Sequence, residues 1–258
     1  MTRHIYTDTF FDYINQSARA SAQPLIGYLY PKLRPSSVLD LGSGRGVWLQ
    51  EWQRKGVADV LGVDGDYVDQ DTLAVERDAF LAADLTQTLN LGRRFDLAQS
   101  LEVGEHLPRA ASEMLVSSLT AASDRVLFSA AVPGQGGEHH INEQPLAFWQ
   151  ELFAARGYRP FDCVRPVLRS NRKVVPWYRY NSILYVNEEG RAGLPDDIMR
   201  SEVPEGTQVK EGGDLVWRLR RAVVSHLPRQ TVTQIAQVRA GILAKRAALQ
   251  SAGPQQSA

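Results

Sequence analysis

Cysteine is almost absent from this sequence of 258 residues, which contains only Cys163. One cysteine excludes an internal disulfide framework and any zinc site built from cysteines alone. Long hydrophobic runs are also missing, because stretches such as 126–132 are far shorter than the ~20 residues that cross a bilayer. We therefore predict a protein without a membrane span that works in the reducing cytoplasm.

An excess of charge of either sign is missing as well. Lys and Arg total 29, Asp and Glu total 29, and the formal net charge is zero. A chain without an overall positive field does not attract polyanions over a distance, so we predict no nucleic-acid partner. The 43% of apolar and 22% of charged residues are typical of a folded globular protein.

Short apolar segments alternate with helical patterns along the first part of the chain. Strands are expected at 37–41, 59–64, 79–83, 95–100 and 125–132, and helices at 47–55, 110–120 and 145–156. Strands that alternate with helices of about a dozen residues indicate βαβ units. The sequence therefore predicts an α/β fold with a doubly wound, mostly parallel sheet and helices on both faces.

The pattern changes after Gly157. Two further strands are expected at 158–164 and 182–186, joined by a loop rich in Arg, Pro and aromatic residues without a helix. Neighbouring strands without a crossover helix pair most naturally in an antiparallel way. The last strand is therefore expected to run against the others.

Residues 1–186 are predicted to form the main domain and 187–250 a helical extension. The tail 251–258, rich in Gln, Ser, Pro and Gly, is predicted to be disordered. Helices are expected in the extension at 215–227 and 232–249. We favour their docking on the protein's own body, with a homodimer or partner contact as the alternative.

The most informative segment is a glycine-rich stretch after the first strand. A buried strand runs into Gly42, Gly44 and Gly46, and a helix begins at Val47. Glycine permits a tight turn and lets a ligand lie against the main chain. The spacing is G-x-G-x-G, whereas a dinucleotide fingerprint is G-x-G-x-x-G and would need Gly or Ala at Val47.

Three carboxylates follow the first three strands. Asp40 would repel a pyrophosphate but could accept hydrogen bonds from the ammonium group of a cationic ligand. Asp64 ends the second strand, where an acid can bind the two hydroxyls of a ribose. Asp84, or the backbone of Leu85, could meet an adenine amino group. A zwitterionic nucleoside without phosphate, S-adenosylmethionine, fits these acids better than NAD does.

These residues, together with Ser100-Leu-Glu-Val-Gly-Glu-His-Leu107, resemble the class I S-adenosylmethionine-dependent methyltransferases. The last segment resembles the E-V-x-E-H signature of a bacterial small-molecule branch that includes ubiquinone-type and sugar O-methyltransferases. The resemblance covers about 6–186 and implies a seven-stranded sheet whose last strand is antiparallel. It implies S-adenosylmethionine as cofactor, bound at Asp40, Gly42, Ser43, Gly44, Gly46, Asp64, Gly65, Asp84, Leu85, Ser100 and Glu102.

Catalytic residues are expected in the loops after the fourth and fifth strands. If the acceptor is a hydroxyl, a general base is needed, and histidine is the side chain best tuned for it near neutral pH. We predict His140 as the base, oriented by Glu138 or Glu143. His139 and His106 are the other candidates, with His106 alternatively forming a wall of the cofactor pocket.

Two alternatives remain for the loop after the fifth strand. Glu138, His139 and His140 could hold a divalent metal for a vicinal-diol substrate, but three adjacent ligands need a sharply bent backbone, so no metal is predicted. Asn142 could instead cap the next helix while the histidines only hydrogen-bond the loop. An aromatic helix ahead of the sheet could form a lid or pack as core; it contains Tyr6, Phe10, Phe11, Tyr13 and Ile14.

Substrate-binding residues are predicted at Glu138, Asn142, Trp177, Tyr178 and Arg179. Cationic and aromatic groups together can hold an anionic or glycosyl substrate, although such a cluster can also be purely structural. We predict O-methylation of a small molecule: a sugar, a glycan precursor or a secondary metabolite. The alternatives are N- or C-methylation, a nucleic-acid methyltransferase, or a non-catalytic scaffold that binds the cofactor.

Overall fold

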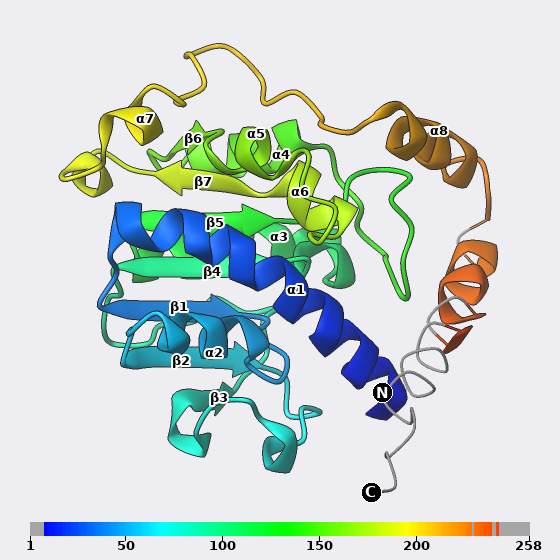
Figure 1. The fold of residues 1–258 in the computed structure, drawn as a ribbon, viewed down its shortest axis with the longest axis horizontal. Helices are drawn as coiled ribbons and strands as arrows, with labels where there is room; N and C mark the ends of the chain where they lie inside the picture. The colour runs from blue at the N-terminus through cyan, green and yellow to red at the C-terminus, as the bar shows by residue number, and fades with distance from the viewer. Residues whose placement is uncertain (1–7, 229, 239–240, 243–258) are drawn as a thin grey trace, which may run out of the picture.

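A seven-stranded sheet lies between two layers of helices (Figure 1). The computed structural model describes residues 8–228, 230–238 and 241–242, with side chains from Ser17 onward. The strands are β1 (Ser37–Leu41), β2 (Asp59–Asp64), β3 (Phe80–Ala82), β4 (Leu97–Leu101), β5 (Arg125–Ser129), β6 (Arg159–Phe161) and β7 (Ile183–Val186).

The α-helices differ widely in length. They are α1 (Asp8–Leu33), α2 (Val47–Arg54), α3 (Ser112–Ala122), α4 (Leu146–Ala154), α5 (Val164–Leu168), α6 (Pro176–Asn181), α7 (Asp196–Met199) and α8 (Leu215–Val224). Short 3-10 helices lie in the connections at Gln70–Thr72, Arg77–Ala79, Gly104–His106, Arg109–Ala111 and Glu189–Arg191. Within the part of the chain that is described, no helix is long and apolar enough to cross a bilayer.

The strand order is β3-β2-β1-β4-β5-β7-β6. Neighbours from β3 to β5 pair in parallel, whereas β7 runs antiparallel to both β5 and β6. This confirms the predicted doubly wound sheet with its last strand antiparallel. The chain order reverses between β1 and β4, and ligands of such sheets bind beyond the carboxyl ends of the strands at this switch point.

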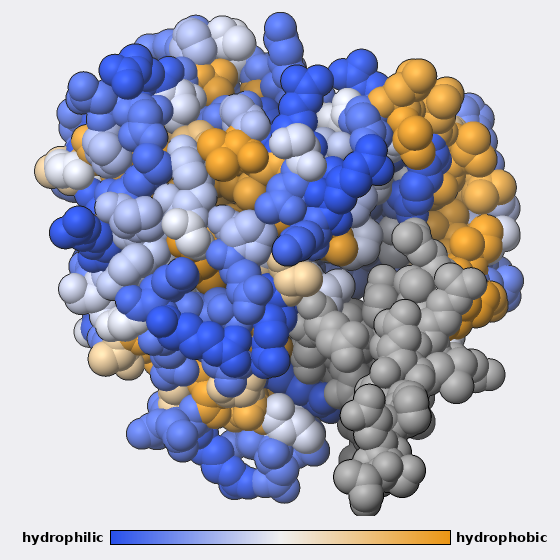
Figure 2. Space-filling view, in the orientation of Figure 1, coloured by the Kyte–Doolittle hydropathy of each residue, from blue (hydrophilic) through white to orange (hydrophobic). Residues whose placement is uncertain are grey.

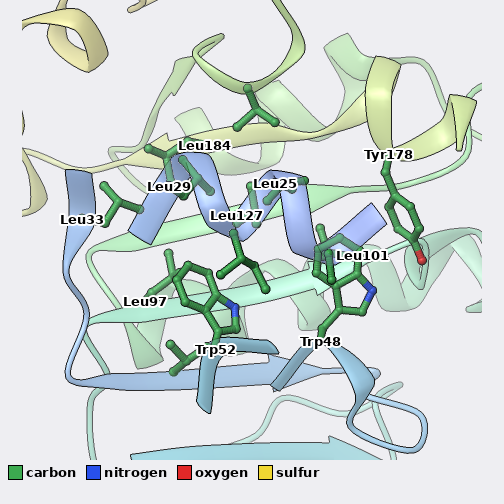
Figure 3. Close-up of a cluster of buried hydrophobic side chains, with 14 of the residues drawn as sticks. Leu25, Leu29, Leu33, Trp48, Trp52, Leu97, Leu101, Leu127, Tyr178 and Leu184 are labelled. Carbon is green, nitrogen blue, oxygen red and sulfur yellow. The ribbon is translucent and has the colours of Figure 1, made fainter. Parts of the chain in front are cut away.

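The sheet has a hydrophobic core on each face. One core joins α1, α2, α5 and α6 to the sheet, and Figure 3 shows Leu25 of α1, Leu127 of β5 and Trp52 of α2 in this cluster. The other core lies under α3 and α4 and includes the fully buried Trp149 and Phe153. Because both faces are covered, β1, β4 and β5 are buried at almost every position rather than at alternate positions.

The predicted helix-free connection between the last two strands is wrong. Helices α5 and α6 lie between β6 and β7. Pro176 is the first residue of α6, a position where its fixed φ and missing N–H are tolerated, so this proline marks a helix start. The two strands nevertheless pair antiparallel, because both helices are short and pack on the core instead of crossing the sheet.

The segment after β7 stays close to the main body before it reaches α8. Ile198 of α7 is fully buried in the core beneath α1, and Phe161 of β6 forms an antiparallel bridge with Glu202. Beyond α8 the described residues 230–238 and 241–242 are helical, as predicted. Tyr6, the side chains at 10–14 and the tail 251–258 lie outside the described residues, so the lid and the disordered tail stay predictions.

Candidate active site

The glycine-rich bend connects the carboxyl end of β1 to α2. Gly42, Gly44 and Gly46 all have positive φ, at 85°, 53° and 79°. A Cβ on Gly42 would meet Val103 at 2.3 Å, whereas a Cβ on Gly44 would meet no atom within 4 Å. The Gly44 backbone therefore borders open space, where a ligand can lie directly against the main chain.

Asp64 holds this bend in place from the end of β2. Its carboxylate accepts hydrogen bonds from the Gly44 N–H at 2.7 Å, the Gly65 N–H at 2.7 Å and the Tyr67 hydroxyl at 2.5 Å. Burial raises the pKa of Asp64, although these three donors counteract the effect. Asp64, which is predicted to bind the ribose, thus contacts the glycine bend, and its carboxylate also accepts a hydrogen bond from Tyr67.

Asp40 is a buried carboxyl at the end of β1 beside Gln99 of β4. Burial raises its pKa to about 7, and the nearby charge of Asp64 acts in the same direction, while Gln99 acts against it. A carboxyl group that is this difficult to ionise gains from a cationic ligand, because the cation replaces the lost hydration. A phosphate at the same place would add repulsion.

The other predicted cofactor residues differ in their burial and in their hydrogen bonds. Asp84 is exposed and its carboxylate accepts hydrogen bonds from the N–H and hydroxyl of Thr86. Leu85 is buried in the core under α3, and Ser43 packs its hydroxyl against Gly62 of β2. Ser100 is fully buried at the end of β4, and its hydroxyl has no hydrogen-bond partner among the described residues.

Glu102 follows β4 in a strained backbone conformation, with φ of 59°. Its Oε2 accepts a hydrogen bond from the Gln135 side chain at 2.6 Å, and Gln135 in turn accepts one from Asn181 at 2.8 Å. In the part of the chain described, the buried Oε1 of Glu102 has no partner. Burial raises the pKa of this carboxyl. Sequence reasoning missed Gln135 and Asn181, which lie far apart in the chain.

His140 is held from one side by Glu143. Its Nδ1 lies 2.8 Å from the Glu143 carboxylate, and its Nε2 lies 4.0 Å from Glu105 Oε1. Burial would raise the pKa of Glu143, but hydrogen bonds from His140 and from the Gly136 and Gly134 N–H groups outweigh it and lower the pKa. Of the two predicted orienting acids, Glu143 is the one in contact with His140.

A second carboxylate approaches His140 from the loop after β4. One ligand atom each from Glu105, His106 and His140 lies within 4.8 Å of the others. Glu105 is fully buried, and neither of its carboxylate oxygens has a hydrogen-bond partner of normal geometry within the described residues. Burial, reinforced by the charge of Glu102, raises its pKa well above the usual range. Glu105 was not among the predicted site residues, although it is the second glutamate of the segment that resembles E-V-x-E-H.

The loop after β5 is clamped to the loop after β4 by its backbone. The N–H groups of Ile141 and Asn142 both donate to the Glu105 carbonyl, at 2.9 and 3.0 Å. The Asn142 side chain is buried and donates to the Gly104 carbonyl and the Ser112 hydroxyl. It does not cap α4, whose N-cap is Pro145, so the capping interpretation is wrong.

The remaining loop candidates lie beside His140. His139 has a positive φ of 56°. Glu138 is partly buried, and this burial raises the pKa of its carboxyl. Among the described residues, the group that could hold a metal ion consists of His140 with Glu105 and His106 from the loop after β4, and it does not include Glu138 or His139. The alternative of three adjacent ligands therefore does not match the assembled geometry.

The predicted aromatic and cationic substrate residues lie on α6. Tyr178 is buried with its ring edge-to-face against Trp48, 4.9 Å between centroids. Arg179 is buried as well, and Trp177 packs against the core on this face of the sheet. These contacts give Tyr178 and Trp177 a structural role in the core, whereas the buried Nε of Arg179 has no hydrogen-bond partner among the described residues.

The buried acids and the open glycine bend suit a cationic nucleoside. Asp40, Asp64 and Glu102 all lie at the carboxyl ends of neighbouring strands, where their ionised forms are disfavoured by burial. The open side of Gly44 leaves room for such a ligand, and Oε1 of Glu102, which has no partner among the described residues, can accept a hydrogen bond from it. The residues present therefore fit S-adenosylmethionine.

Comparisons with known proteins agree with this fold. A crystal structure of DesVI from Streptomyces venezuelae matches with a TM-score of 0.51 and 16% identity, covering 70% of this chain and 96% of the other. An O-methyltransferase family protein from Burkholderia thailandensis matches with a TM-score of 0.50 and 12% identity, covering 68% and 59%. A search of curated protein sequences finds no match.

The sheet order and the acid-lined glycine bend define the class I methyltransferase fold. Residues 14–149 match the sequence profile of a family described as a methyltransferase domain, and the chain belongs to this family. It is therefore a methyltransferase, and its methyl donor is S-adenosylmethionine.

Proposed function

We propose that this enzyme methylates a hydroxyl group of a small molecule, with His140 as the general base. The contact between His140 Nδ1 and Glu143, 2.8 Å long, is the observation that carries the proposal. A carboxylate can only accept, so Nδ1 carries the proton and Nε2 is left free to take one. The Burkholderia thailandensis neighbour is described as an O-methyltransferase family protein, which agrees with this direction.

The proposed reaction is a single displacement. S-adenosylmethionine supplies a methyl group on a positively charged sulfur. His140 Nε2 takes the proton of the acceptor hydroxyl as the new carbon–oxygen bond forms and the carbon–sulfur bond breaks. Glu143 stabilises the imidazolium that results. The loop that carries both residues is held by hydrogen bonds to Glu105, which fixes the base relative to the end of β4.

The acceptor class is proposed as a sugar, a glycan precursor or a secondary metabolite. An uncharged hydroxyl suits a site rich in buried carboxylates better than a phosphate or a nucleic acid does, because no anion then has to approach Asp40, Glu102 or Glu105. Methylation of a neutral amine would not require this base for the attack itself, because the nitrogen lone pair is already available.

A screen of hydroxylated acceptors with radiolabelled S-adenosylmethionine tests the proposal. We expect label transfer by the wild type, and a rate reduced by 100-fold or more in His140→Ala, in the range typical of a lost general base. His139→Ala is the matched control and is expected to keep most activity. Normal turnover by His140→Ala would remove His140 as the base.

A divalent cation is the second candidate for this group of residues. Two histidine nitrogens and one carboxylate form a recurrent three-ligand arrangement with open positions for substrate, and Glu105, His106 and His140 present it here. The unpartnered oxygens of the buried Glu105 favour this reading, and Glu143 would orient His140 from behind. A bound cation would lower the pKa of an acceptor hydroxyl directly.

The general base and the cation site both need Nε2 of His140, so only one of the two can be correct. His140 Nε2 cannot ligate a cation and accept a proton at the same time. Dialysis against a chelator followed by addition of Mg²⁺, Mn²⁺ or Zn²⁺ separates them. Activity that is unchanged by the chelator supports the base, whereas activity that is lost and restored by one of these ions supports the cation site. Calorimetric titration then measures the affinity of each ion for the wild type and for Glu105→Gln, without any need for turnover.

A further inference from the structure

Charge is distributed very unevenly along this electrically neutral chain. Residues 215–258 contain seven of the 29 Lys and Arg residues and none of the 29 Asp and Glu residues. Residues 1–214 therefore carry 22 basic and 29 acidic residues. A cationic end on an otherwise acidic chain indicates a binding function for that end.

Helix α8, at the start of this cationic end, has two different faces. The inner face is docked: Trp217 is buried, Arg220 donates to the Gln135 carbonyl at 2.6 Å, and Arg221 donates to the Pro133 carbonyl at 2.8 Å. The outer face is apolar and open to solvent, with side-chain exposures of 75% for Val216 and 58% for Leu219. The outer face comprises Leu215, Val216, Leu219 and Val223.

The helical residues after α8 continue the same pattern. Ile235, Val238 and Ile242 are all exposed, and their spacing of three and four residues places them on one side of a helix. In Figure 1 both helical segments lie at the edge of the molecule toward which β1, β2 and β4 point. Figure 2 shows hydrophobic side chains gathered over α8 at this edge.

Such a surface needs an occupant that is both anionic and able to receive apolar side chains. A symmetric dimer through this surface would bring the same cationic segment of both chains together, which is unfavourable. Helices that lie on membranes combine apolar residues on one face with Lys and Arg beside them. Arg218, exposed between Val216 and Leu219 in the sequence, provides such a cation.

We propose that the outer face of α8, together with Ile235, Val238 and Ile242, docks on the surface of an anionic lipid bilayer. The apolar side chains enter the boundary of the acyl chains, and the excess of positive charge in 215–258, which includes the exposed Arg218, attracts anionic headgroups.

This docking surface is in direct contact with the active-site loop. A Cβ on Gly134 would meet the Arg221 carbonyl at 2.5 Å, and one on Gly136 would meet Val224 at 2.9 Å, so α8 packs closely on this loop. Gln135, between the two glycines, holds Glu102. A bilayer bound at α8 would therefore lie next to the loop that carries Gln135 and His140.

Co-sedimentation of the full chain with lipid vesicles tests the proposal. We expect binding to phosphatidylcholine vesicles that contain about one third phosphatidylglycerol, little binding to pure phosphatidylcholine, and loss of binding at high salt. The double variant Val216→Glu/Leu219→Glu should bind at least about tenfold more weakly, because two carboxylates then face the headgroups. Both positions are exposed, and circular dichroism melting checks that the variant is folded.

The matched control places the same charges at exposed apolar residues elsewhere. Val167 on α5 and Leu81 on β3 are 49% and 43% exposed, and Val167→Glu/Leu81→Glu should bind the mixed vesicles like the wild type. Failure to sediment with the mixed vesicles, or equal binding to pure phosphatidylcholine, would overturn the proposal. So would a dimer in sedimentation velocity that Val216→Glu/Leu219→Glu dissociates in the absence of lipid. None of these readouts depends on methyl transfer.

Discussion

Glu143 and His140 form the most specific pair in the active site, with 2.8 Å between the Glu143 carboxylate and Nδ1 of His140. Glu143 also accepts hydrogen bonds from the N–H groups of Gly134 and Gly136. The backbone of the loop therefore holds the Glu143 carboxylate in place, and the carboxylate in turn holds the imidazole ring of His140. This arrangement orients Nε2 toward Glu105.

Glu143→Gln should lower kcat by about 100-fold, because a glutamine amide can donate to Nδ1 and stabilise the wrong tautomer. Affinity for S-adenosylhomocysteine, measured by calorimetry, should change by less than about twofold. Glu138→Gln, in the same loop, is the control and should keep kcat near the wild-type value. An unchanged kcat in Glu143→Gln would rule out the orienting role.

Gly44→Ala should weaken S-adenosylhomocysteine binding by at least about tenfold, because the new methyl group enters the open space beside the bend. The positive φ of 53° adds strain that costs about 1 kcal/mol of stability. Gly193→Ala is the matched control, since Gly193 also has a positive φ and nothing within 4 Å of the added Cβ. If both variants bind the ligand equally well, the ligand does not lie on Gly44.

The stability of the ligand-free enzyme should fall as pH rises from about 4 to 7. Asp40 has a pKa of about 7 when folded, against 3.8 as its ordinary value, so the folded state holds a proton that the unfolded state has released. Asp40→Asn should flatten this slope, although Asp64, Glu102 and Glu105 contribute in the same direction. Urea unfolding at about pH 5 and about pH 8 measures the effect. The same change in the free energy of unfolding with pH in wild type and Asp40→Asn would contradict this role of Asp40.

Much of the fold was predictable from the sequence because the strands buried on both faces contain short runs of apolar residues. The segments at 37–41 and 59–64 show this directly, and the structure has both strands at these bounds. The helices α5 and α6 were missed because each is too short to show a helical period. Their packing on α1 and the sheet stabilises them, and a local sequence pattern contains no information about that contact.

The active site was predictable only in part, for a similar reason. Glycines and acids at strand ends, such as Gly44 and Asp64, have fixed places in a doubly wound sheet. Glu105 and Gln135 acquire their importance from how two loops fold against each other, which their own segments do not determine. The E-V-x-E-H resemblance was the one signal that could have led to Glu105.

A crystal structure with S-adenosylhomocysteine tests the central claim most directly. We predict the nucleoside against Gly44 and Asp64, with its sulfur facing His140. The distance from the sulfur to Nε2 of His140 should be about 8 Å or less, which leaves room for one acceptor hydroxyl between them. A sulfur more than about 12 Å from Nε2, or one that faces away from the loop after β5, would contradict His140 as the base that serves this methyl transfer.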